Sequence, residues 1–318
     1  MRVAVLDDYF NKALELADWS PLKGRADVKV FTKHLGESED ALAKTLADFE
    51  IVVGMRERTA FRAGLLQRLP KLKLLITTGM RNASFDIAAA AKQGVTVCGT
   101  GGVGSPTSEL AVGMMIALMR DIPRQFDSMK KGGWQTHAGA DLAGKTMGML
   151  GLGKLGGAVA RVALAFDMKV IAWSQNLTDA RAKECGATRV DKDTLFRQSD
   201  VISVHLVLSD RSRGLVGERE LSLMKPTAYI VNTSRGPIID EKALLKALKA
   251  RKIAGAALDV YGSEPLAKDD PIRKLDNVLL TPHLGYVTAE NLAKMYTDAV
   301  ADIVGFLDGK PVRVIPPK

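Results

Sequence analysis

The 318-residue sequence predicts an α/β protein with two doubly wound parallel sheets, one domain being inserted into the other. Short β-rich runs alternate with amphipathic stretches from end to end, which is the pattern of strand–helix–strand units. A second, complete series of strands begins near residue 146, and a glycine-rich turn follows its first strand. A domain that starts there with its own first strand cannot also contain the strands before residue 100. The sequence therefore predicts two domains.

The first third of the chain contains the first series. Its predicted strands are Arg2–Leu6, Ile51–Val53, Leu72–Thr77 and Val95–Cys98. Helical patterns such as Asp40–Asp48 and Ser84–Gln93 lie between them. The glycine-rich segment 99–106 follows, and then a long apolar helical pattern over Thr107–Arg120.

The second series has six predicted strands: Thr146–Leu150, Lys169–Ala172, Val201–His205, Ala228–Asn232, Ala254–Leu258 and Val278–Thr281. Segments 121–124 and 130–134 are expected to be connectors, and a last helix is predicted over Thr288–Leu307. The simplest assembly is a domain of residues 1–100 plus 287–318, interrupted by a domain of residues 101–286. The two crossings, near 99–106 and 284–290, are expected to act as hinges beside a substrate cleft.

The glycine turn after the Thr146–Leu150 strand predicts a dinucleotide site. Gly151, Gly153 and Gly156 have G-x-G-x-x-G spacing. The first glycine permits a tight turn, the second lets a pyrophosphate approach the backbone, and the third lets helix and strand pack closely. The phosphates would then meet the amides at the start of a helix. We expect that helix to place one apolar face inward, with Leu155, Val159, Val162 and Phe166.

Composition argues against several other functions. The formal charge is +9, yet lysine and arginine are scattered among acids, and Lys242, Lys246 and Lys249 are expected to form a solvated helix face. We therefore expect no nucleic-acid partner, although the positive field would attract small anions. No apolar run is long enough to span a membrane, and the N-terminus enters a strand directly, so a cytoplasmic location is expected. Cys98 and Cys185 are too few for a disulfide framework or zinc site, so we expect buried cysteines and no metal.

Three residues after the glycine turn are candidates for catalysis: Arg235, Glu264 and His283. Each lies just past the carboxyl end of a predicted strand, where open parallel sheets bind ligands. Histidine titrates near neutral pH and suits the proton donor that reduction of a 2-keto acid needs. A neighbouring carboxylate favours the protonated imidazole and fixes its tautomer, and a guanidinium grips a substrate carboxylate with two hydrogen bonds.

The ordered blocks of the chain resemble the D-isomer-specific 2-hydroxyacid dehydrogenases. The matching blocks are the Gly151–Gly156 turn, Met224-Lys-Pro, Asn232-Thr-Ser-Arg-Gly, Ala257-Leu-Asp-Val, Glu264-Pro-Leu and Thr281-Pro-His. The resemblance covers nearly the whole chain. It implies a Rossmann domain inserted into a flavodoxin-like substrate domain, and a homodimer with the 107–120 helix in its interface. It also implies that Arg235 binds the substrate carboxylate, His283 is the general acid and base, and Glu264 is its partner.

The resemblance further implies a cofactor, NAD or NADP, and a small anionic 2-keto or 2-hydroxy acid as substrate. Asp259 would meet the nicotinamide carboxamide, and His205 would line the cofactor groove rather than act as an acid. The full expected cofactor set is Thr107, Gly151, Gly153, Lys154, Leu155, Gly156, Ser174, His205, Val207, Thr233, Ser234, Asp259 and Gly285. The expected substrate set is Arg56, Gly79, Met80 and Arg81, with backbone amides around Gly79 receiving the carboxylate.

Several positions depart from the family pattern. Ser174 stands where an acid commonly binds the ribose 2′-hydroxyl, so NADP is as open as NAD; Arg181 is the nearest downstream cation. Arg81 lies in a segment where a usual glycine is replaced, and it either adds a cation for the substrate, points to solvent or pairs with an acid across the cleft. Tyr286 replaces a small residue beside His283, where it would narrow or close the pocket. Asp167 replaces a helix-ending glycine, and aspartate tolerates the left-handed conformation needed there.

Two other readings stay open at this point. One is a formate-dehydrogenase-like enzyme, which would carry glutamine at the position of Glu264. The other is a nucleotide-sensing corepressor, which an intact catalytic set does not exclude. The sequence leaves the particular 2-hydroxy acid, the preferred cofactor and the physiological direction open.

Overall fold

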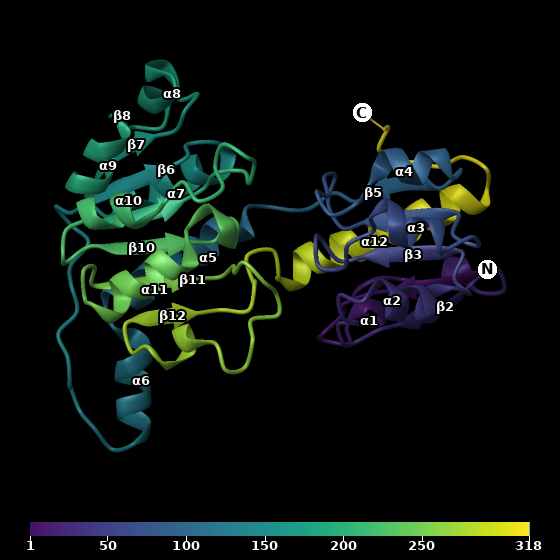
Figure 1. Ribbon diagram of the computed structural model, residues 1–318, viewed down its shortest axis with the longest axis horizontal. Coiled ribbons are helices and arrows are strands. Elements are labelled where there is room, and N and C mark those ends of the chain that lie inside the picture. The colour runs from purple at the N-terminus through teal and green to yellow at the C-terminus, as the bar shows by residue number, and fades with distance from the viewer. Residues whose placement is uncertain (318) are drawn as a thin grey trace. The chain divides into compact units, whose positions relative to one another are not determined.

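The computed structural model describes residues 1–317, which form two compact units (Figure 1). The first unit contains Met1–Gly104 and the chain from Val287 onward, and the second contains Ser105–Tyr286. Both are α/β units with parallel sheets, as the alternating sequence pattern predicts.

The first unit contains a five-stranded parallel sheet in the order β2-β1-β3-β4-β5. Its strands are β1 (Arg2–Val5), β2 (Asp27–Val30), β3 (Ile51–Gly54), β4 (Leu74–Thr77) and β5 (Thr96–Gly99). This is the flavodoxin-like strand order. The sequence does not predict β2, because this edge strand is not buried and carries the exposed side chains of Asp27 and Lys29.

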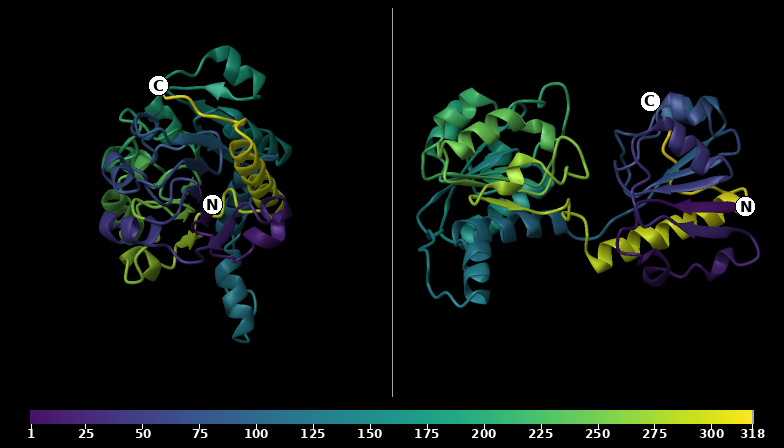
Figure 2. Two further views of the ribbon diagram at one scale, coloured as in Figure 1. Left: turned by 90° about the vertical axis from the view of Figure 1, so that its right-hand side faces the viewer. Right: turned by 60° about the horizontal axis from the view of Figure 1, so that its bottom comes forward.

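Helices pack against the first sheet (Figure 2). They are α1 (Ala13–Leu16), α2 (Glu39–Leu46), α3 (Ala63–Gln67), α4 (Ile87–Lys92) and α12 (Ala289–Leu307), with a short 3₁₀ turn at Ser20–Leu22. The C-terminal α12 packs on α1, β4 and β5, while α3 packs between α2 and α4. Leu292, Met295, Tyr296 and Ile303 form the buried apolar side of α12.

The second unit contains a seven-stranded parallel sheet in the order β12-β11-β10-β9-β6-β7-β8. Its strands are β6 (Thr146–Leu150), β7 (Lys169–Trp173), β8 (Thr188–Arg189), β9 (Val201–Val204), β10 (Tyr229–Asn232), β11 (Gly255–Leu258) and β12 (Val278–Leu280). The first six strands in chain order have the Rossmann arrangement, with β6 central and the order reversing beside it. The sequence predicted every strand except the two-residue β8.

Two buried apolar clusters lie in the second unit. The helices are α5 (Pro106–Met119), α6 (Ile122–Lys130), α7 (Lys154–Ala165), α8 (Asp179–Glu184), α9 (Lys192–Gln198), α10 (Glu218–Leu223) and α11 (Glu241–Lys249), with 3₁₀ turns at Gly236–Ile238 and Pro271–Lys274. Residues of α5, α7 and α8 belong to one cluster, and residues of α9, α10 and α11 belong to the other. The glycine turn between β6 and α7 therefore follows a strand in the middle of the sheet, and the two apolar clusters pack on that sheet.

Two local predictions were wrong. Segment 121–124 is not a connector, because Pro123 sits in the first turn of α6, where its missing N–H costs nothing. The predicted apolar face of α7 was also misplaced: Val159 is buried, but Leu155, Val162 and Phe166 are all exposed by more than a third. The buried face of α7 is instead made by small residues, including Gly156, Ala160 and Ala163.

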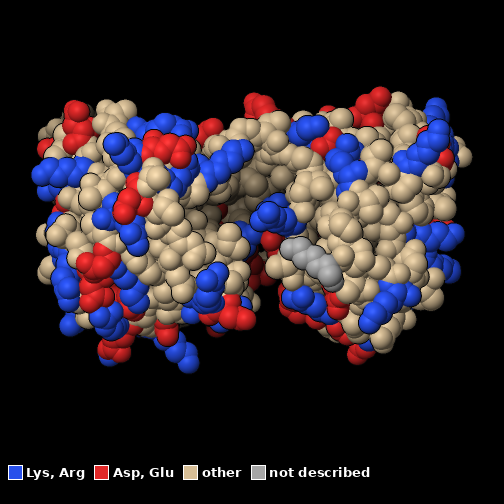
Figure 3. All heavy atoms as spheres, turned by 90° about the horizontal axis from the view of Figure 1, so that it is seen from above, with Lys and Arg blue, Asp and Glu red and all other residues tan. Residues whose placement is uncertain are grey.

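Three other local predictions are confirmed, for Asp167, for the two cysteines and for Lys246 on α11. Asp167 adopts φ +55° after α7, and Cys98 and Cys185 are buried. The surface mixes cations and acids in the view of Figure 3, and Lys246 on the exposed face of α11 pairs with Glu218 at 2.7 Å. In residues 1–317, no helix is long and apolar enough to cross a membrane.

The buried carboxylate of Asp302 in α12 sets a pH dependence on the first unit. Arg313 Nη2 lies 3.0 Å from one of its oxygens and also donates to the Asp298 carbonyl oxygen at 2.7 Å. Burial raises the pKa of Asp302 from its ordinary value of 3.8 to about 7, although the guanidinium opposes this shift. The folded protein therefore binds a proton at Asp302 that the unfolded chain releases between these pH values.

We predict that Asp302→Asn flattens the pH dependence of stability. For a carboxyl group with a raised folded-state pKa, stability falls as pH rises from about 4 to about 7. Since each pKa unit corresponds to about 1.4 kcal/mol, the loss in the wild-type protein is at most about 4 kcal/mol. Thermal unfolding between pH 4.5 and 8 measures it. The control is Asp308→Asn, which removes the exposed partner of Arg25 at the end of α12; an Asp302→Asn protein with the wild-type slope would contradict the prediction.

Candidate active site

The glycine turn leaves room for a ligand at one glycine only. Gly151 adopts φ +101°, and a Cβ there would lie 2.8 Å from the His205 carbonyl oxygen. At Gly156 a Cβ would lie 2.3 Å from the Gly151 carbonyl oxygen, so this glycine lets α7 pack onto the turn. At Gly153 a Cβ would have no neighbour within 4 Å. The open position is the one through which a pyrophosphate would approach the backbone.

The start of α7 fits the phosphates of a dinucleotide. Gly153 is the N-cap residue and supplies no side-chain hydrogen bond, and Lys154 and Leu155 follow in the first turn, both exposed. Helix N-termini bind anions through their amides and the positive end of the helix dipole. A second observation supports a polar ligand: the hydroxyl of Thr233, after β10, is buried and has no hydrogen-bond partner in the described part of the chain. The residues present therefore fit a bound dinucleotide.

The end of β7 carries no acid. Ser174 follows Trp173, and its carbonyl oxygen accepts from Leu177 in a turn that leads into α8. The guanidinium of Arg181, in α8, donates to the carbonyl oxygens of Leu152 and Gly153 at 3.1 and 3.2 Å, and also pairs with Glu184. The nearest cation predicted from the sequence is thus attached to the glycine turn itself.

His205, just past the end of β9, is not suited to proton transfer near neutral pH. Burial lowers its pKa to about 4, so the imidazole is neutral at pH 7. Its Nε2 lies 2.8 Å from the Ser203 hydroxyl. The neighbouring Val207 is 79% exposed, and the Ser234 hydroxyl donates to the Leu206 carbonyl oxygen. The loops after β9 and β10 are therefore joined directly.

Arg235 lies in the loop after β10, and its neighbours hold it there by hydrogen bonds. Its Nη1 donates to the Ser234 carbonyl oxygen at 2.7 Å, and the Asn232 side chain donates to the Arg235 carbonyl oxygen at 3.0 Å. The next residue, Gly236, packs against the loop after β11: a Cβ there would lie 2.1 Å from the Tyr261 carbonyl carbon. The arginine is thus presented at the carboxyl edge of the sheet by a tightly packed loop.

Glu264 and His283 form a direct pair. Nδ1 of His283 lies 2.5 Å from Oε2 of Glu264, and the two side chains are only 15% and 22% exposed. The other carboxylate oxygen of Glu264 accepts from the Tyr261 amide at 3.0 Å. His283 itself adopts φ +56°, a conformation that is uncommon for a residue with a side chain. Backbone and side chain are both held in one place.

Asp259, just past β11, fixes the loop that carries His283. One carboxylate oxygen accepts from the Thr281 hydroxyl at 2.5 Å and the Leu284 amide at 2.7 Å, and the other accepts from the Gly285 amide at 2.8 Å. The residue is fully buried. Burial raises the pKa of Asp259, and its three hydrogen bonds oppose the shift by favouring the carboxylate. Thr107 completes the anchor, because its hydroxyl donates to the Gly285 carbonyl oxygen at 2.7 Å.

In the first unit, Arg56 and Gly79 lie together beyond β3 and β4. Nη1 of Arg56 donates to the Thr78 carbonyl oxygen at 2.9 Å, and the Arg56 amide donates to the Thr78 hydroxyl at 2.8 Å. A Cβ at Gly79 would clash with this guanidinium, and Gly79 itself adopts φ +106°. The Gly79 amide donates to the Thr100 hydroxyl at 2.9 Å. The expected anion-binding amides are therefore reduced to those of Met80 and Arg81, for which the described residues show no partner.

The residues that support these loops were not predicted from the sequence. Asn82 donates to the Arg56 carbonyl oxygen at 2.6 Å and to the Thr77 hydroxyl at 2.9 Å. The Tyr261 hydroxyl donates to backbone oxygens at Leu258 and Thr281. Asn82 and Tyr261 each follow a strand end by only a few residues, which is the only sequence signal that could have found them. Within residues 1–317, no group of three histidine, cysteine or acidic side chains is arranged to hold a metal ion.

Comparisons with known proteins identify the family of this chain. Residues 112–285 match the family model described as the D-isomer specific 2-hydroxyacid dehydrogenase, NAD binding domain. The chain is 37% identical over 316 residues to the D-3-phosphoglycerate dehydrogenase of Archaeoglobus fulgidus, covering 98% of this chain but 58% of that protein. It is 35% identical to the hydroxypyruvate reductase of Thermotoga maritima, covering 95% of this chain and 97% of that protein.

A solved structure gives the same answer. The phosphoglycerate oxidoreductase of Vibrio cholerae superposes with a TM-score of 0.91 at 34% identity, covering 97% of this chain and 99% of that chain. Fold and site define a two-unit α/β protein whose second unit contains a Rossmann-type parallel sheet with a glycine-rich turn after its first strand. The chain belongs to the D-isomer-specific 2-hydroxyacid dehydrogenase family.

The glycine turn yields a matched pair of predictions. Gly156→Ala places a methyl group against backbone and should lower the free energy of unfolding by about 2–3 kcal/mol. Gly153→Ala, in open space, should change it by less than about 0.5 kcal/mol but weaken dinucleotide binding at least about tenfold, because the methyl group occupies the phosphate approach. Thermal unfolding and fluorescence titrations with NADH and NADPH measure both effects. Tight binding of both dinucleotides by the Gly153→Ala protein would contradict the assignment.

Proposed function

We propose that this chain transfers a hydride between NAD(P)H and the C2 carbonyl of a small 2-keto acid, giving the D-2-hydroxy acid. The observation that carries the proposal is the 2.5 Å hydrogen bond between Nδ1 of His283 and Glu264. It lies at the carboxyl edge of the sheet whose first loop is the glycine turn. An acid–base pair on the same edge as a dinucleotide turn is the arrangement that carbonyl reduction requires.

His283 is the proposed proton donor. Because Nδ1 is committed to Glu264, Nε2 is the nitrogen that would give its proton to the carbonyl oxygen as the alcohol forms. Glu264 holds the tautomer and stabilises the charged imidazole. A glutamine at residue 264 would supply no such charge, so this pair also favours a keto-acid reductase over a formate-dehydrogenase-like enzyme.

Arg235 is proposed to bind the substrate carboxylate. A guanidinium forms two parallel hydrogen bonds with a carboxylate, which orients the adjoining keto group as well as binding it. Arg56, Gly79, Met80 and Arg81 of the first unit are proposed as further substrate-binding residues. Glyoxylate, hydroxypyruvate and larger 2-keto acids all contain the reacting unit.

A bound nicotinamide dinucleotide would supply the hydride. The residues proposed to hold it include Gly153, Lys154, Thr233 and Asp259. Since Asp259 already accepts three hydrogen bonds, its main part would be to hold the 281–285 loop that carries His283. Ser174 presents no negative charge to a ribose 2′-phosphate, so NADP remains as compatible as NAD with this site.

We predict that His283→Gln lowers kcat/KM for glyoxylate or hydroxypyruvate by about 10²–10⁴-fold, the usual contribution of general acid catalysis. Arg235→Gln should raise KM at least about tenfold, because one charged hydrogen-bonding partner of the carboxylate is lost. Steady-state assays with NADH and NADPH measure both effects. The control is His137→Gln, which changes an exposed histidine near α6. Near-normal turnover in the His283→Gln protein would show that the acid is a different group.

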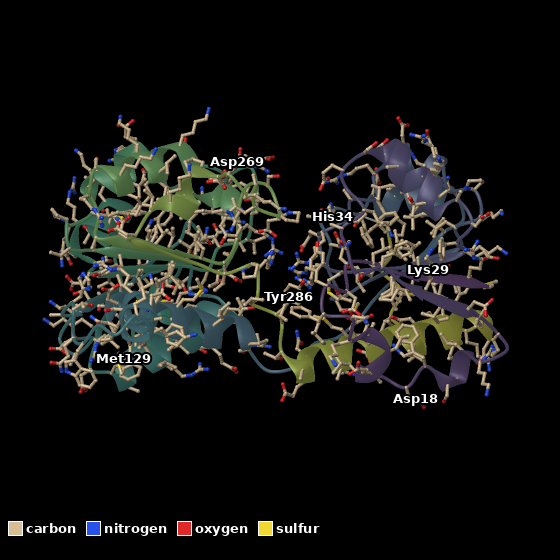
Figure 4. The ribbon with its side chains drawn as sticks, turned by 90° about the horizontal axis from the view of Figure 1, so that it is seen from below. Asp18, Lys29, His34, Met129, Asp269 and Tyr286 are labelled. Carbon is tan, nitrogen blue, oxygen red and sulfur yellow. The ribbon has the colours of Figure 1, made fainter. Side chains whose placement is uncertain are left out.

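We further propose that the protein is a homodimer that uses α5 and α6. Ile122, Phe126 and Met129 on α6 are exposed by 49%, 58% and 58%, and Trp134 in the following loop by 74%. Met129 is labelled in Figure 4, and together these side chains line a shallow apolar hollow. Exposed apolar patches of this kind are typical of protein interfaces. Because α6 packs on α5, the surface continues the helix that the family resemblance assigns to the dimer.

We predict that Phe126→Asp converts a dimer into a monomer at micromolar concentration, because a charge would be buried in an apolar interface. Sedimentation velocity measures the change. The control is Lys131→Asp, which alters an exposed charge on the same segment. A wild-type protein that sediments as a monomer would refute the proposed interface.

A further inference from the structure

The ring of Tyr286 packs against the imidazole of His283. The two ring centroids are 5.6 Å apart, and the ring planes are inclined by 77°, which is an edge-to-face contact (Tyr286 is labelled in Figure 4). Aromatic rings favour this geometry because the positive edge of one meets the negative face of the other. The contact therefore defines an orientation as well as a distance.

The loop that precedes Tyr286 places its ring. Asp259 holds the amides of Leu284 and Gly285, and Thr107 holds the Gly285 carbonyl oxygen. A Cβ at Gly285 would lie 3.1–3.2 Å from Thr107 and Asp259, so the chain passes through a tight space there. Tyr286 is the first side chain after this constriction, and it is half-buried. Its position is thus set by the same anchor that sets His283.

A packing contact restricts the imidazole further than its hydrogen bond does. The ring is attached at Cγ and hydrogen-bonded at Nδ1 to Glu264, yet small coupled rotations about the Cα–Cβ and Cβ–Cγ bonds can still pivot it within the tolerance of that hydrogen bond. A pivot would swing Nε2 away from the line along which it must donate, and donation requires an angle near linear. The Tyr286 ring occupies the side of the imidazole and blocks that motion.

We propose that Tyr286 is a positioning residue for the proton donor, and that its ring, not its hydroxyl group, holds the His283 imidazole in the orientation set by Glu264. The inference rests on the proposed function of His283. It goes beyond a pocket-narrowing role, because it assigns Tyr286 an effect on the chemical step with small substrates that the pocket already admits.

Three variants separate the ring, the hydroxyl and the volume. Tyr286→Phe keeps the ring, Tyr286→Leu keeps most of the volume, and Tyr286→Ala keeps neither. With glyoxylate and NADH or NADPH, we expect the Phe protein to retain kcat within about twofold. We expect the Leu and Ala proteins to lose about tenfold in kcat, which corresponds to about 1.4 kcal/mol, with KM changed less than about twofold.

A spectroscopic readout does not depend on turnover. The chain has four histidines, so the ring signals of His283 are assignable by comparison with His283→Gln. The Tyr286 ring current shifts the imidazole protons of His283, and we expect this shift to persist in the Phe protein and to disappear in the Leu and Ala proteins. If the Ala protein fails to fold, the Leu protein decides the question.

Three results would overturn the proposal. The first is an unchanged glyoxylate kcat in the Leu and Ala proteins, including the case in which only a bulky substrate such as phenylpyruvate gains activity. The second is a Phe protein as impaired as the Ala protein, since the hydroxyl would then carry the effect. The third is an identical His283 ring spectrum in all variants. A wild-type protein that reduces no 2-keto acid would instead refute the proposed function, while the spectra would still decide the orientation.

Discussion

The carboxylate of Asp259 is the constraint on which the candidate site depends. Three donors from one short loop converge on it, and two of them are the amides that follow His283. A buried carboxylate is costly unless its oxygens accept hydrogen bonds. Moving this loop away would leave the Asp259 carboxylate buried without its donors, so the loop is held in place. This fixes the backbone of His283 at a positive φ. The Glu264 hydrogen bond and the Tyr286 ring then act on an imidazole whose backbone is already held in place by this loop.

The parallel sheet explains why these groups lie on one edge. The strands β9, β10, β11 and β12 run in the same direction, so the loops that carry His205, Arg235, Asp259 and His283 all leave from their carboxyl ends. Close packing between neighbouring loops supplies the rest. Gly236 packs against Tyr261, and Gly156 packs against Gly151, at distances that no side chain would allow. These glycines therefore act on the site through the spacing of the loops.

The sequence predicted most of the architecture because buried parallel strands are short apolar runs with a clear signal. It missed β2 and β8, which lie at sheet edges and lack that signal. It also missed the start of α6, because segment 121–124, which places Pro123 in the first turn of this helix, was expected to be a connector. The apolar face of α7 was misassigned because glycine and alanine, not larger side chains, form its contact with the sheet. In such cases tertiary packing decides between patterns that are locally equivalent.

The candidate site, too, was predicted from the sequence only in part. The sequence alone indicates Arg235, Glu264 and His283 by their positions after strands, and the structure brings Glu264 and His283 into direct contact. Sequence could not give the supporting contacts. The use of the Gly79 amide by Thr100, the anchor at Asp259 and the ring of Tyr286 against His283 all depend on side-chain directions in loops. Loop conformation follows from packing with distant segments, which residue spacing does not encode.

The most direct test of the account is the fate of the hydride. Glyoxylate has no stereocentre in its product, so pyruvate or hydroxypyruvate should be reduced with NADH or NADPH deuterated at C4 of the nicotinamide, in both stereochemical forms. The account predicts a D-2-hydroxy acid that carries deuterium at C2 from one of the two forms. An L product, or a product without deuterium at C2, would contradict it.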